Sequence, residues 1–176
     1  MGRISNNLQK GFTLIELIVV IGIISILAVG ALAALNPFAQ FQKANDVRRK
    51  SDFSQIQKAL ETYYQDQGHY PPNATQCTYE ILGNNGGGND CIEWGQSWQP
   101  YMNVIPSDPT TGNKYVYYVT SDGQSYYLYA NLNRGAQDPQ ACNSGNACNS
   151  LSSNGIPANS CGGKCNFGVS SPNVSP

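Results

Sequence analysis

The chain has 176 residues with 10 Lys and Arg, 11 Asp and Glu and a single histidine, so its formal net charge is −1. This near-neutral charge excludes nucleic-acid binding by bulk electrostatic attraction. With one histidine, no G-x-S-x-G motif and no acids clustered at catalytic spacing, the sequence predicts a structural or binding protein rather than an enzyme.

A long apolar segment dominates the N-terminal part of the chain. Phe12 to Leu35 is a run of 24 residues whose only charged member is Glu16. As a helix this run would be about 36 Å long, which is enough to cross a bilayer. Because Arg3 and Lys10 precede it, the positive-inside rule places the following residues outside the cytoplasm. We therefore expect a single-pass inner-membrane precursor with an extracytoplasmic head.

The start of this segment carries a recognisable motif. Residues 10–16, with the sequence KGFTLIE, resemble the prepilin-type cleavage and methylation motif of type IV pilins and type II secretion pseudopilins. The resemblance implies that a prepilin peptidase cleaves after Gly11 and N-methylates the new first residue, Phe12. Residues 1–11 would be a leader peptide. The apolar run follows the cut and would be retained, unlike that of a secretory signal.

The resemblance also identifies Glu16 as the self-assembly residue, and the physical chemistry agrees. A carboxylate within an apolar membrane helix is costly and marks a functional position. Cleavage would create a cationic amine on Phe12, four residues before Glu16. In a filament of staggered helices, the amine of one subunit could neutralise the carboxylate of its neighbour and fix the axial register. The alternative is that Glu16 snorkels to the membrane edge.

The helix is expected to continue beyond the membrane. Pro37 should kink or locally break it, because proline lacks a backbone N–H. We interpret the sequence as one long helix over 12–67, in which 12–36 is the transmembrane or filament-core part and 37–68 an amphipathic continuation. Gly68 should end the helix. The apolar stripe of the continuation is expected to pack on the head and consists of Phe38, Phe41, Ala44, Val47, Phe53, Ile56, Leu60 and Tyr63.

Charged residues interrupt this stripe. Asp46 is spaced to pair with Arg49 and Lys50 across one turn, and we expect all three side chains to be solvated. The basic run 48–50 could contact lipid headgroups or the acids of a neighbouring subunit, or it could form a solvated face.

Two strands are predicted in the head, which would span 69–176. Residues 114–120 and 125–132 alternate in the strand pattern, and Asp122-Gly123 between them is typical of a hairpin turn. One face of the hairpin should lie on the long helix, and the other would expose tyrosines to water or to a neighbouring subunit. The segment before the hairpin, Ile105 to Pro109 with Gly112, resembles the PxDP…G segment of major pseudopilins.

Six cysteines lie in the head, where an exported location favours disulfides over free thiols. Cys77 and Cys91 are expected to close one loop. The tail from residue 132 is rich in Asn, Ser, Gly and Pro and cannot bury enough apolar area to fold alone. Its cysteines are expected to staple it in a connectivity that the sequence leaves open, and they are Cys142, Cys148, Cys161 and Cys165.

Two kinds of metal site are conceivable in the tail. A zinc site is the alternative use of the tail cysteines, but their spacing lacks paired C-x₂-C units. Major pseudopilins can hold calcium in the loop after the sheet. Here that region offers Asp138 and little else, so we expect no calcium, and no cofactor or metal of any kind.

The family resemblance implies an α+β, type IV pilin-like fold: a long N-terminal helix on a small antiparallel sheet, with a disulfide-stapled C-terminal loop region. It implies a structural subunit that is processed by prepilin peptidase and assembled by a membrane machinery into a homo-oligomeric helical filament. The mature subunit would be extracellular or periplasmic.

Two alternatives stay open. The hairpin and Asp108-Pro109 favour a major pseudopilin of a type II secretion system, whereas the stapled tail and the missing calcium ligands favour a displayed pilus. A membrane-anchored binding module that never polymerises is the alternative of another class, and it leaves the position of Glu16 unexplained.

Overall fold

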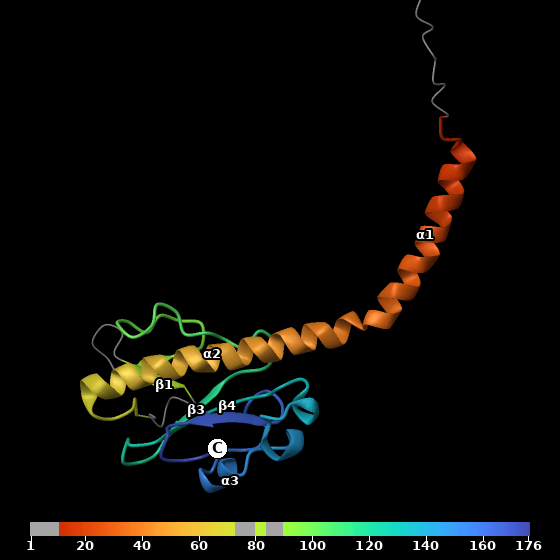
Figure 1. Cartoon of the computed structure of the whole chain (residues 1–176). Helices are drawn as coiled ribbons and strands as arrows, with labels where there is room; N and C mark the ends of the chain where they lie inside the picture. Colours follow the sequence, from red (N-terminus) through yellow and green to blue (C-terminus); the bar gives the residue numbers. More distant parts are fainter. Residues whose placement is uncertain (1–10, 73–79, 84–89) are drawn as a thin grey trace, which may run out of the picture. The chain divides into compact units, whose positions relative to one another are not determined.

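The N-terminal part of the chain forms two consecutive helices. The computed structural model describes residues 11–72, 80–83 and 90–176. Helix α1 spans Leu14–Leu35 and helix α2 spans Pro37–Gln67 (Figure 1). The single helix expected over 12–67 is therefore divided. The chain forms two compact units that divide near the start of α2. One ends at Gln40 and the other spans Phe41–Pro176.

Asn36 is the residue that divides the helices. Its backbone is left-handed, with φ 42° and ψ 70°, a conformation that asparagine tolerates better than most residues. Both its carbonyl oxygen and its side-chain Oδ1 accept the N–H of Ala39, at 3.1 and 3.3 Å. Pro37 is consequently the first residue of α2, a position where its missing N–H costs no helical hydrogen bond.

The described part of the head contains two antiparallel sheets. In the smaller one, β1 (Ile81–Gly83) pairs with β2 (Asp90–Ile92). The larger one has the order β3-β4-β5, from β3 (Val116–Val119), β4 (Tyr126–Ala130) and β5 (Phe167–Ser170). The predicted hairpin is confirmed as β3–β4, with Gly123 in its turn at φ 69°. The tail also contains short helices at Gly135–Gln137, Cys142–Gly145 and Ser150–Ser153, the last of which is α3.

The side of the larger sheet that faces α2 forms the main core. Phe53, Ile56 and Leu60 of α2 are at most 1 % exposed, and the Phe53 and Tyr115 rings meet edge to face at 5.1 Å. The alternate strand residues complete this core, and they are Tyr117, Val119, Tyr126, Leu128 and Ala130. The predicted packing of one hairpin face on the helix is confirmed.

The opposite side of the sheet is also covered, and the expectation of exposed tyrosines there is wrong. Tyr127 and Tyr129 are buried against a second core from the tail, which includes Leu151, Ile156 and the tail cysteines Cys148, Cys161 and Cys165. Figure 1 shows α3 and α2 on opposite sides of β3–β4. Few apolar residues are needed for this layer because the disulfides hold them in place. The expected α+β fold with a disulfide-stapled C-terminal region is thus confirmed.

The first half of the α2 stripe does not pack on the head as expected. Phe38 and Phe41 are each 70 % exposed and Val47 is 59 % exposed. The first buried residue of α2 is Asp46, so the head covers the helix only from this point onward. Helical periodicity marked a face of α2, but it did not show how far along that face the head extends.

Candidate functional site

The N-terminus of α1 is closed by a capping box. The Glu16 carboxylate accepts the Thr13 backbone N–H at 2.9 Å and the Thr13 hydroxyl at 2.7 Å, and the Glu16 N–H donates to Thr13 Oγ1 at 3.3 Å. These bonds satisfy orphan donors at the helix start. We did not predict this contact from the sequence, although Thr-x-x-Glu before an apolar run is its signature.

The surroundings of Glu16 are apolar. Phe12, Ile15, Val19 and Val20 line a shallow recess of about 300 Å³ beside it. Within the described part of the chain no cation pairs with Glu16. The carboxylate is therefore oriented by Thr13, and among the described residues its charge has no cationic partner. Gly11 and Phe12 precede α1 and are exposed, so the peptide between them lies outside the helix.

Helix α1 has the composition of a membrane span. Leu14–Leu32 is long and apolar enough to cross a bilayer, and none of this segment is buried within the protein. The one hydroxyl in its middle, Ser25, donates to the carbonyl of Ile21 at 2.7 Å, so it presents no unsatisfied donor to lipid.

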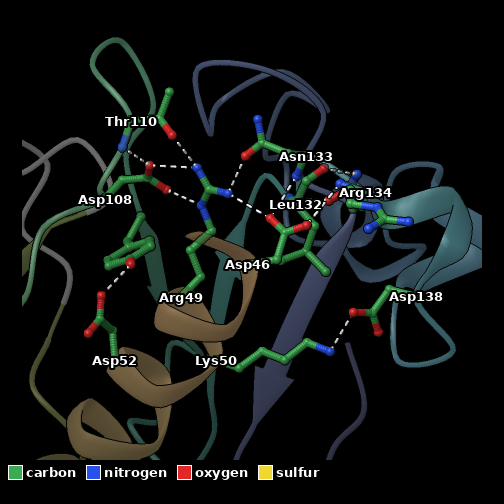
Figure 2. Close-up of polar contacts among 12 residues, drawn as sticks. Asp46, Arg49, Lys50, Asp52, Asp108, Thr110, Leu132, Asn133, Arg134 and Asp138 are labelled. Atoms are coloured by element: carbon green, nitrogen blue, oxygen red, sulfur yellow. Dashed lines mark hydrogen bonds and ion pairs between the residues drawn. The ribbon is translucent and has the colours of Figure 1, made fainter. Parts of the chain in front are cut away.

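A fully buried arginine organises the first turns of α2 within the head (Figure 2). Arg49 Nε and Nη2 donate to the two carboxylate oxygens of Asp108 at 2.8 and 2.9 Å. Nη2 also donates to Thr110 Oγ1 at 2.8 Å, and Nη1 donates to Asp46 at 2.7 Å and to Asn133 Oδ1. All five guanidinium N–H groups are used, and the side chain is 0 % exposed.

The carboxylates of this network also fix the loops. Asp46 accepts the backbone N–H groups of Asn133 and Arg134 at 2.8 and 2.9 Å, and Asp108 accepts that of Thr110 at 2.8 Å. The network therefore ties α2 to the segment before β3 and to the segment after β4. The expectation that Asp46 and Arg49 would be solvated is wrong: they pair with each other as their spacing suggested, but both are buried because their other partners lie more than 55 residues away in sequence.

Burial and neighbouring charges shift the pKa values of two groups in this region. Burial alone would lower the pKa of Arg49, but the hydrogen bonds and charges of Asp108 and Asp46 outweigh it and raise that pKa. Burial also raises the pKa of Asp52, although the Tyr115 hydroxyl donates to it at 2.7 Å.

Lys50 is a half-buried cation of α2 that pairs with the tail. Its Nζ lies 2.5 Å from Asp138 and 5.6 Å from the centre of the Phe167 ring. Burial tends to raise the pKa of Asp138, but Lys50 and the backbone N–H of Gln140 reverse the effect and lower it. The carboxylate singled out in the calcium comparison is thus neutralised by the chain itself. The described residues include no group of three metal-ligating side chains.

The tail cysteines form two small disulfide loops, Cys142–Cys148 and Cys161–Cys165. Cysteines bonded in this way are not available as zinc ligands. Cys77 lies outside the described residues, so its pairing with Cys91 stays a prediction.

Two family models match the chain. The model described as the prokaryotic N-terminal methylation motif matches residues 6–32, which include Gly11, Phe12 and Glu16. The model described as type II secretion system (T2SS), protein G, matches residues 36–147, which is more than half of the chain. The chain belongs to the T2SS protein G family. Comparisons with curated proteins and with solved structures found no significant match.

Membership of the protein G family places the chain among pilins and pseudopilins, and both matching models describe parts of structural proteins rather than of an enzyme. The methylation motif together with α1 supports a membrane-anchored precursor. The protein G match includes Arg49 and Asp108, and it ends before Cys148. Helix α3, strand β5 and most of the second core therefore lie beyond the matched region.

Proposed function

We propose that this protein G family member is the subunit of a helical filament and that α1 forms the filament core. In this proposal a prepilin peptidase cleaves the precursor between Gly11 and Phe12 and N-methylates Phe12. The observation that carries the proposal is Glu16: its carboxylate lies at the start of an exposed apolar helix, held by Thr13, with no cation from the described residues beside it.

The exposure of α1 supports assembly through this helix. The large apolar side chains that are exposed from Phe12 to Leu32 range from 45 % exposed at Val20 to 85 % exposed at Phe12. An apolar helix that the described residues leave uncovered is stable in lipid or against other apolar helices. Moving from membrane to filament replaces lipid contacts with subunit contacts, and a fixed charge pair would set the register of those contacts.

The capping box would survive processing. Both Thr13 donors lie after the proposed cut, so Glu16 would keep its orientation in the precursor and in the mature subunit. Cleavage would add a cationic terminus one residue before Thr13. A neighbouring subunit's terminus could then approach a carboxylate that is already oriented.

Within filament systems, we favour a surface pilus over a secretion pseudopilus. The tail beyond the protein G match forms a disulfide-stapled layer over one side of the sheet, as expected for a displayed subunit. The match to protein G itself and the Asp108-Pro109 segment favour the pseudopilin alternative.

The test compares Glu16→Gln with Asp66→Asn, which neutralises an exposed acid in the last turn of α2. Each variant replaces the wild-type chain in its own cells, and processing and the amount in sheared surface material are measured. We expect Glu16→Gln to be cleaved and to remain in the membrane, with recovery reduced at least about a hundredfold, since breaking a buried charge pair costs about 3 kcal/mol or more. Unchanged recovery of Glu16→Gln, or retention of the wild-type chain in the membrane, would instead support the anchored binding module.

A further inference from the structure

A cationic cavity lies beside the first half of α2. Its volume is about 370 Å³. One wall comes from α2 and the other from the segment that follows β4, and both walls belong to the compact unit Phe41–Pro176. The lining residues are Lys43, Asp46, Val47, Lys50, Arg134, Gln137, Asp138 and Pro139.

Both carboxylates in the lining are already neutralised. Asp46 is bonded to Arg49 and to two backbone N–H groups. Asp138 accepts from Lys50 at 2.5 Å and from the backbone N–H of Gln140 at 2.9 Å. Neither acid is therefore available to a further cation in the cavity.

Two cations in the lining are not used by the fold. Among the described residues, none forms an ion pair or a side-chain hydrogen bond with Lys43 or with the guanidinium of Arg134. The Arg134 backbone N–H is fixed by Asp46, and Figure 2 shows its guanidinium extending away from Arg49. A planar guanidinium and an ammonium on opposite walls suit the oxygens of a phosphate group.

The charge along α2 indicates where such a group would be met. Residues 37–51 carry four cations and one acid, whereas residues 52–67 carry one cation and three acids. The basic half is the one that follows the membrane span. Lys43 comes eleven residues after Leu32, the last residue of the span. Basic residues that follow a membrane span this closely in sequence are attracted by anionic headgroups.

We propose that the cavity binds the phosphate of an anionic phospholipid headgroup, held by Lys43 and Arg134. The apolar side chains of Val47 and Pro139 would contact the glycerol part of the lipid. The proposal rests on the proposed membrane anchoring through α1. It assigns the cavity to the stage before assembly, because a subunit that leaves the membrane must release the lipid.

The experiment titrates the full chain, in a nonionic detergent micelle, with short-chain phosphatidylglycerol, phosphatidylcholine or inorganic phosphate. Native mass spectrometry measures the dissociation constant of the first bound molecule. The variants are Lys43→Ala and Arg134→Ala, and Lys58→Ala is the matched control because it removes one exposed cation from the acidic half of α2. We expect wild type to prefer phosphatidylglycerol. Each cavity variant should weaken its binding about fivefold, and Lys58→Ala should not change it.

Several results would overturn the proposal. Equal affinity for the two lipids, or equal loss in all three variants, would reduce the cavity to a solvated basic surface. Inorganic phosphate binding as tightly as the lipid would keep an anion site but reject lipid as its occupant. A dimer that is lost in the cavity variants would assign the surface to a second copy of the chain. Carbonate extraction of cell membranes tests the anchoring separately, so failure of the anchor and failure of the headgroup site are distinguishable.

Discussion

Replacing Arg49 with methionine should destabilise the head more than any exposed charge change. Methionine retains most of the side-chain length and removes all five donors. The variant would leave Asp108, whose side chain is 0 % exposed, and Asp46, which is 6 % exposed, without their shared cation. Breaking a buried charge pair from one side costs about 3–5 kcal/mol. We expect a decrease of this size in the free energy of unfolding.

The neighbouring arginine provides the matched control. Arg48 is 62 % exposed and lies 4.0 Å from Asp52, so Arg48→Met should cost less than about 1 kcal/mol. Urea unfolding of the full chain, with disulfides intact, can be followed by the fluorescence of Trp94 and Trp98, which both lie in the head. The double variant with Asp108→Asn should lose less than the sum of the two single changes, because one stranded charge is removed. An Arg49→Met variant as stable as Arg48→Met would refute the account of the network.

Three further predictions concern single contacts. Burial raises the pKa of Asp52 in the folded chain, so ionisation of this carboxyl opposes folding. As the pH rises above about 4, the free energy of unfolding of Asp52→Asn should therefore increase relative to that of wild type. A difference between the two that stays constant across pH 3–8 would contradict this. Gly162→Ala should lose at least about 1 kcal/mol more in urea unfolding than Gly155→Ala: both glycines have positive φ, but a Cβ at Gly162 would lie 2.6 Å from a neighbouring backbone carbon, and one at Gly155 meets open space. Thr13→Val removes the cap of α1 and should speed amide exchange at the start of that helix about fivefold. Thr62→Val removes a hydroxyl that caps no helix end, so amide exchange at the start of α1 should be unchanged in this control.

Local patterns in the sequence predicted the elements that depend on local contacts. Alternation along the hairpin separated the two faces correctly, and Gly123 takes the positive φ that its turn requires. The three- and four-residue spacing after Phe53 identified the core face of α2.

Long-range contacts account for what the sequence did not predict. Arg49 and Asp46 looked like a surface pair, because nothing local shows that Asp108 and Asn133 would surround them. The tyrosines of β4 were expected to be exposed, since the tail that covers them has few apolar residues and depends on disulfides. Phe41 was expected to be buried but is exposed, because periodicity does not show where a partner surface begins.

The most direct test of the central claim is the intact mass and N-terminal sequence of the protein recovered from sheared cell-surface material. The proposed function predicts a chain that begins with N-methylated Phe12 and lacks residues 1–11. A full-length chain, found only in the membrane fraction, would contradict it.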